Sequence, residues 1–115
     1  MEHGDRVLRA VQSSLWRKLV AVLRKRGFYF VVEPFITYAK LLKNVDPEEL
    51  FETSPSKFYS LVEEYFRGDR EAAYFFIDYL LSVLIPGDYE LRREIIECMR
   101  RGDDDKVREL LASSQ

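Results

Sequence analysis

Few of the residue types that usually carry catalysis occur in this chain of 115 residues. The single histidine, His3, lies near the start, and the single cysteine, Cys98, lies in a stretch whose apolar residues have helical spacing. A cysteine nucleophile or a zinc site needs further partners of these types, so we interpret Cys98 as a small core residue. Glycine-rich phosphate loops and a nucleophile elbow are also missing. The sequence therefore predicts a protein that is not an enzyme and that uses no cofactor and no metal.

Carboxylates are the remaining candidates for acid–base or metal chemistry. Glu71 and Asp78 are seven residues apart, so a helix would place both on one face, where a second helix could supply partners. The run 103–105 is three aspartates, but it lacks the alternating ligands and the glycine of a calcium loop. Acidic residues favour the first turn of a helix, and charged residues are rarely buried unpaired. We therefore interpret the run as helix capping, and Glu71 and Asp78 as a solvent-exposed strip.

Four of the five glycines are followed directly by aspartate, at positions 4–5, 68–69, 87–88 and 102–103. Glycine takes the left-handed conformation that closes a helix, and aspartate accepts hydrogen bonds from the first turn of the next helix. Each pair thus predicts the end of one helix and the start of another. Two pairs complete Arg-Gly-Asp triplets, which this mechanism explains without a role in cell adhesion.

Between these boundaries the apolar residues recur with helical spacing. We expect helices over residues 5–26, 31–43, 47–52, 55–67, 70–85, 88–101 and from 103 onward. Residues 28–33 could also form a strand, but a lone strand lacks a pairing partner, and Pro34 fits the first turn of a helix from about Val31. Segment 70–85 is apolar almost all round. The predicted fold is all-α: a single domain over residues 1–115, built as a bundle of six or seven helices with a buried central helix near 70–85.

The composition bears on location. The chain has one cysteine, no apolar stretch of the secretory type after its charged start, and no apolar run as long as a membrane span. We therefore expect a cytoplasmic protein. Twelve arginines against six lysines, with one asparagine and two glutamines, are typical of proteins from hot environments.

The two parts of the chain carry opposite charge. Residues 1–45 have a net charge of +6, whereas residues 46–115 have a net charge of −8. Either the basic first helix packs beside the acidic part, or its cationic face binds an acidic partner such as nucleic acid, an anionic membrane or another protein. The candidate contact residues are Arg6, Arg9, Arg17, Lys18, Arg24, Lys25 and Arg26.

Residues 46–66 also have the rhythm of a helix-turn-helix reader, with a short helix, a tight turn and a longer helix that opens Ser-Pro-Ser-Lys. Five glutamates in this segment would repel DNA phosphates. An ordinary helical corner is the alternative interpretation.

Three segments between residues 41 and 84 carry a family resemblance: NVDPEEL, FYSLVEEYFRGDREA and the apolar helix that follows. Together they resemble the small helical output-type domains of unknown function found in archaea. The resemblance implies a regulatory or signalling interaction module without catalytic residues. It identifies no ligand.

Fifteen phenylalanines and tyrosines, together with Trp16, are many for a domain of this size. A small bundle would leave some of them exposed, and exposed aromatic residues favour interfaces. We expect a non-enzymatic module that acts in protein–protein interaction, regulation or as an adaptor. It would bind a protein partner or form a homo-oligomer, and we predict no small-molecule ligand. Nucleic-acid binding is the alternative. The candidate interface aromatics are Tyr29, Phe30, Phe35, Tyr38, Tyr59, Tyr74 and Tyr79.

Overall fold

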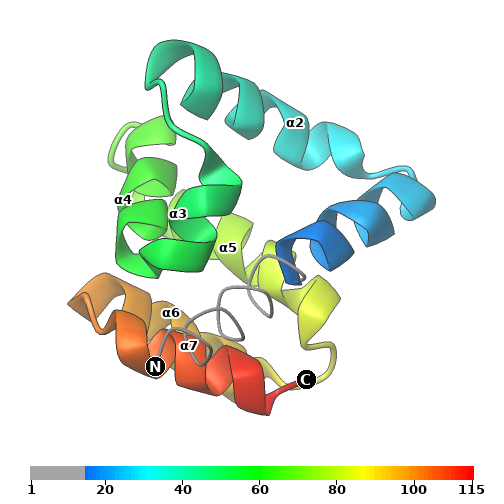
Figure 1. Cartoon of the computed structure of the whole chain (residues 1–115), viewed down its shortest axis with the longest axis vertical. Coiled ribbons are helices and arrows are strands. Elements are labelled where there is room, and N and C mark those ends of the chain that lie inside the picture. The colour runs from blue at the N-terminus through cyan, green and yellow to red at the C-terminus, as the bar shows by residue number, and fades with distance from the viewer. Residues whose placement is uncertain (1–14) are drawn as a thin grey trace, which may run out of the picture.

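The structure is a computed structural model, and it describes residues 15–115 (Figure 1). Over this range the chain forms helices joined by short connections and contains no strand, which confirms the predicted all-α fold. A helix over residues 15–26 comes first. It is followed by α2 (Tyr29–Thr37), the π-helix η1 (Tyr38–Leu42), α3 (Pro47–Thr53), α4 (Pro55–Tyr65), α5 (Arg70–Leu84), α6 (Tyr89–Arg101) and α7 (Asp104–Ser113). The predicted helical start at residues 5–14 lies outside the described residues.

Three of the glycine–aspartate pairs act as the sequence predicts. Asp69, Asp88 and Asp103 each accept a hydrogen bond from the backbone N–H three residues further on, at 3.0, 3.1 and 3.3 Å. The glycine before each of them has a φ of 79–84°, in the left-handed region. The fourth pair, at residues 4–5, lies outside the described residues. A cap of this kind stabilises a helix by about 1 kcal/mol, so the start and end of these helices are encoded locally.

The second helix starts earlier than predicted. Gly27, with a φ of +77°, turns the chain tightly enough for α2 to begin at Tyr29 and not near Val31. Pro34 therefore lies inside the helix and not in its first turn. Proline has no N–H, so the carbonyl of Phe30 loses its usual helical partner. Since both Phe30 and Pro34 are exposed, water can reach that carbonyl.

In Figure 1, α5 runs through the middle of the molecule, α4 packs against it on the left, and α6 and α7 pack beside each other below them. The helix over residues 15–26 and α2 form an open V on the other side. Helix α5 is the predicted central helix and packs against α4 and α6, burying Phe76, Ile77 and Leu80. It is not enclosed all round, because Phe75 is 60% exposed.

The core is rich in aromatic rings. Phe35 of α2 is fully buried, and its ring centroid lies 5.5–5.6 Å from those of Phe58, Tyr65 and Phe76. Trp16, from the helix over residues 15–26, lies 5.7 Å from the same Phe58 ring. Edge-to-face pairs of this kind add about 0.5–1.5 kcal/mol each beyond the burial of their surface. These contacts attach the two arms of the V to α4 and α5.

One ion pair fastens α5 to α6. Arg92 Nε donates to Asp78 Oδ1 at 2.8 Å, and Arg92 Nη1 donates to the carbonyl of Ile85 at 2.9 Å. The two charged side chains are only 12% and 20% exposed. The expectation that Asp78 would belong to an exposed strip is therefore wrong, because a long arginine from the next helix reaches back to it. Glu71, the other member of that strip, is exposed.

Replacing Arg92 with glutamine should lower the free energy of unfolding by about 2 kcal/mol, because it leaves a mostly buried carboxylate without its charge-assisted partner. Urea unfolding followed by circular dichroism measures the loss. Arg100→Gln is the matched control, since its pair with Glu97 is about 40% exposed on both sides and contributes at most about 0.5 kcal/mol. Equal losses in the two variants would show that Arg92 makes no special contribution.

Candidate interaction surface

The described residues contain no cluster of reactive groups. Among residues 15–115, no three histidine, cysteine or acidic side chains are placed to hold a metal ion. Cys98 is fully buried in α6, and burial raises the pKa of its thiol. Arg101 Nη2 donates to the Cys98 sulfur at 3.2 Å, and the positive charge of Arg101 partly opposes this rise in pKa. A buried thiol held neutral is a poor nucleophile, which agrees with the interpretation of Cys98 as a core residue.

The outward side of α2 and η1 is the most apolar exposed part of the described chain. Phe30, Leu41 and Leu42 are 67%, 77% and 75% exposed, and Pro34 lies between them on the same side. We call these four residues the outer face. The opposite side of the same helix carries buried Val32, Phe35 and Ala39 and packs into the core. Figure 1 shows this helix along the edge of the molecule, with its outward side uncovered by the other described helices.

The π-helix turn shapes the end of this face. The N–H of Lys43 donates to the carbonyl of Tyr38 at 3.3 Å, a bond that spans five residues where an α-helix spans four. The wider turn directs both Leu41 and Leu42 outward while Ala39 stays buried. Two adjacent leucines thus reach solvent from one turn of helix. Insertions of this type occur frequently at functional sites.

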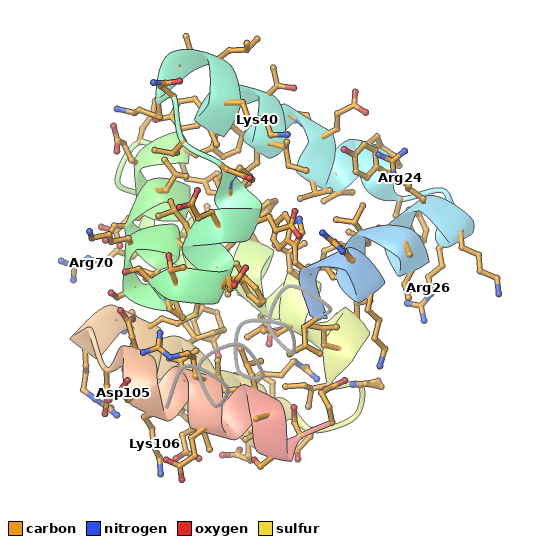
Figure 2. All side chains as sticks on the ribbon, in the orientation of Figure 1. Arg24, Arg26, Lys40, Arg70, Asp105 and Lys106 are labelled. Atoms are coloured by element: carbon orange, nitrogen blue, oxygen red, sulfur yellow. The ribbon has the colours of Figure 1, made fainter. Side chains whose placement is uncertain are left out.

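Two opposite charges border the outer face. Glu33 and Lys40 are exposed, lie seven residues apart, and have no ion pair with another residue in the range 15–115. Figure 2 labels Lys40 on this helix. An apolar strip with one acid toward its start and one base toward its end can match a second strip that runs the opposite way.

A basic corner adjoins the start of α2. Arg24, Lys25 and Arg26 end the first described helix, and all three are exposed (Figure 2). The Arg24 guanidinium lies over the Tyr29 ring, 4.0 Å from its centroid. Phe28 is 46% exposed, and its ring centroid is 6.3 Å from that of Phe30. The corner therefore combines three cations with exposed aromatic surface.

The other basic candidates are engaged or lie outside the described residues. Arg17 Nε is 3.3 Å from Glu48 Oε1, and Lys18 Nζ donates to Gln115 Oε1 at 3.1 Å. Packing of the basic helix beside the acidic part of the chain thus accounts for part of its charge. Arg6 and Arg9 lie outside the described residues. Arg17 and Lys18 are exposed but have these polar partners, whereas the cations of the corner form no ion pair within residues 15–115.

The aromatic candidates divide by burial. Phe30 is exposed, whereas Tyr29, Tyr38, Tyr74 and Tyr79 are half-buried. Phe35 and Tyr59 were expected at an interface, but both are buried in the core, because they lie on the inward sides of α2 and α4. Sequence reasoning missed Phe28, Leu41 and Leu42. The 11-residue spacing from Phe30 to Leu41, three turns of helix, was the signal that could have revealed the leucines.

The helix-turn-helix-like segment corresponds to α3 and α4. Such a reader must present the start of its second helix to the bases. Here Asp104 of α7 occupies that start: Ser56 N–H donates to its Oδ1 at 2.8 Å, and Ser54 Oγ donates to its Oδ2 at 3.2 Å. A carboxylate already holds the groups that would face DNA, so we do not propose this segment as a nucleic-acid reader.

The pKa of Tyr74 is raised well above that of an ordinary tyrosine. Burial is the main reason that its pKa rises to about 12, and a hydrogen bond with Tyr89 and the nearby Asp78 carboxylate add to the rise. Arg93 opposes it. The neutral phenol is therefore the form that fits between α5 and the start of α6.

An alkaline titration followed by tyrosinate absorbance should show Tyr74 ionising near pH 12, later than an ordinary tyrosine near 10. Its raised pKa stabilises the fold fully below about pH 10, and this stabilisation is lost as the pH rises toward 12, because the unfolded chain releases its proton first. Tyr74→Phe should remove this late step, and Tyr89→Phe should move it to lower pH. A late step that persists in Tyr74→Phe would assign it to another group.

Within residues 15–115, no helix has the length and apolar character needed to cross a lipid bilayer. Comparison of the chain with protein-family models, with curated proteins and with solved structures finds no significant match.

Proposed function

We propose that this protein is a non-catalytic helical interaction module that self-associates through the outer face of α2 and η1. The observation that carries the proposal is the exposure of Phe30, Leu41 and Leu42 on one side of one helix. Monomeric proteins tolerate scattered exposed apolar residues, but a contiguous apolar strip marks an interaction site. A regulatory or adaptor role fits such a module, and the single buried cysteine suits the reducing cytoplasm.

A second copy is the partner that the pattern matches best. If two copies of the helix pack antiparallel about a two-fold axis beside Ile36, Phe30 of each copy meets Leu42 of the other. The same axis places Glu33 of one copy opposite Lys40 of the other, to within about one residue along the helix. The symmetry repeats this pair, so Lys40 of the first copy lies opposite Glu33 of the second. Two-fold contacts are self-complementary in this way, and they are the commonest symmetry of protein dimers.

The energetic gain of this arrangement comes from apolar burial. Covering a leucine or phenylalanine side chain removes it from water and contributes roughly 1.5–3 kcal/mol. In a two-fold contact both copies contribute Phe30, Leu41 and Leu42, so six large apolar side chains are removed from water. The Glu33–Lys40 pairs lie at the rim, where an exposed ion pair contributes about 0–1 kcal/mol. They set the direction of the two helices more than the strength of the contact.

Leu41→Glu should convert the dimer into a monomer, because it places a charge in the apolar contact. Light scattering coupled to size exclusion should give twice 13.7 kDa for the unchanged protein and 13.7 kDa for the variant. Phe75→Glu is the matched control, since Phe75 is also a largely exposed apolar residue but lies on another helix, α5. The proposal fails if the unchanged protein is a monomer over the concentrations tested, or if Phe75→Glu dissociates the dimer equally.

Charge exchange tests the antiparallel orientation. Lys40→Glu alone should weaken the dimer, because it faces Glu33 of the second copy. The double variant Glu33→Lys with Lys40→Glu should restore the association, since the opposite charges then face each other again. Dimers of the double variant that are weaker than those of either single variant would exclude this orientation.

Nucleic-acid binding is the second candidate function, and the basic corner favours it. Single-stranded nucleic acids bind to cations that contact the backbone and to aromatic rings on which bases stack. Arg24, Lys25 and Arg26 provide the charges, and Phe28 provides an exposed ring.

Fluorescence anisotropy with a single-stranded DNA oligonucleotide should then show binding that weakens steeply with salt. Replacing Arg24 and Arg26 with glutamine should reduce the slope of log affinity against log salt by about 1.4, because each lost phosphate contact contributes about 0.7 for single strands. Arg93→Gln, an exposed arginine of α6, is the control. No binding at low salt would exclude this second function.

A further inference from the structure

A depression between α4, the start of α5 and the end of α6 gathers positive charge. It measures about 440 Å³, a volume within the range of small-molecule sites. Four cations line it: Lys57 from α4, Arg70 from α5, and Arg100 and Arg101 from α6. Among the described residues that line it, Glu63 is the only one with a carboxylate.

This concentration of cations contrasts with the region that contains it. Residues 46–115 hold nine lysines and arginines against seventeen acidic residues. The depression collects four of those nine cations but one of the seventeen acids. The fold has therefore brought together residues as far apart in sequence as Lys57 and Arg101 to form a cationic concave surface in an acidic region.

Two of the four cations are partly engaged, and two are not. Arg100 Nη1 pairs with Glu97 Oε1 at 3.0 Å, and Arg101 Nη2 lies 3.2 Å from the sulfur of Cys98. Within residues 15–115, the side chains of Lys57 and Arg70 make neither a hydrogen bond nor an ion pair, and both residues are exposed. Figure 2 shows the Arg70 side chain pointing away from the molecule beside α4. These two side chains can turn toward an anion without breaking an existing contact.

Tyr59 forms part of the same lining, and its phenol lies within electrostatic reach of three other lining residues: Arg70, Arg100 and Glu63. Burial raises the pKa of its phenol most, while Arg100 and Arg70 lower it and Glu63 raises it further. The hydroxyls of Ser56 and Ser60 also line the depression and can donate to an anion. Asp104 lies at the start of α4, beside the depression, and already accepts the Ser56 N–H, so the groups that can bind an anion are side chains and not that N–H.

We propose that this depression binds a small molecule through a phosphate group, with Lys57 and Arg70 as the principal contacts. A phosphate carries up to two negative charges and several acceptor oxygens, which suits convergent cations and hydroxyls better than a single carboxylate does. Arg100 and Arg101 contribute the positive field behind them. The site lies on α4, α5 and α6 and shares no residue with the outer face, so it does not depend on self-association.

Titration of the full chain with inorganic phosphate and with pyrophosphate, followed by amide chemical shifts, tests the site. Shifts should concentrate at Tyr59, Ser60, Arg70 and Arg100, with pyrophosphate binding more tightly than phosphate. The double variant Lys57→Gln with Arg70→Gln should weaken pyrophosphate binding about tenfold or more, since charge-assisted contacts are lost. Both residues are exposed, so circular dichroism should show an unchanged fold.

Arg26→Gln, an exposed cation at the basic corner, is the matched control and should leave the affinity unchanged. Acetate at the same concentration should give much smaller shifts. Equal weakening by Arg26→Gln would mean that only the overall charge matters and would overturn the proposal. So would shifts that acetate reproduces, shifts centred on the corner, or unchanged affinity in the double variant.

Discussion

The burial of Phe35 is the contact on which the shape of this molecule depends. Its ring meets Phe58 and Tyr65 of α4 and Phe76 of α5, and the side chain is fully buried. Because Phe35, Val32 and Ala39 lie on one side of the helix, α2 is held by that side alone. Its other side has no neighbour among the described helices (Figure 1). The way α2 is anchored thus determines which residues are presented to solvent, and these include Phe30 and Leu41.

The distribution of charge follows from the same arrangement. The first 45 residues are basic and the remainder acidic, yet within the described range only two ion pairs join the two parts: Arg17 with Glu48, and Lys43 with Glu64. The end of the first arm, marked by Arg24 and Arg26, and Asp105 of α7 lie on opposite sides of the view in Figure 2. The cations at residues 24–26 form no ion pair with the acidic part within the described range. Conversely, cations of the acidic part are brought together by the packing of α4 against α6.

The helix boundaries could be predicted from the sequence because caps are local. Asp69, Asp88 and Asp103 bond to a backbone N–H only three residues away, so the sequence contains both partners. Exposure is different, because it depends on which neighbours arrive from distant parts of the chain. Phe30 and Phe35 are both apolar residues of one helix, and only the position of α4 and α5 decides that one is exposed and the other buried.

Features built from residues far apart in the chain could not be predicted from the sequence pattern either. The pairing of Asp78 with Arg92 depends on the turn between α5 and α6, and the helical spacing of the sequence did not predict the π-helix turn at Tyr38–Leu42. The cationic depression draws on three helices, whose charges are spread over more than 40 positions of the chain. Periodicity reports which face of one helix is apolar, but it does not report how faces of different helices meet.

Helix α6 shows, within the same molecule, what an ordinary solvent-facing side looks like. Its exposed positions include Glu90, Arg93, Glu94 and Arg100, while Ile95, Ile96 and Met99 are buried. The outer face of α2 and η1 departs from this pattern, since its most exposed positions carry one phenylalanine and two leucines. Exposed apolar side chains contribute nothing to the stability of a monomer and reduce its solubility. The contrast between the two solvent-facing sides is therefore the argument for the proposed self-association through the outer face.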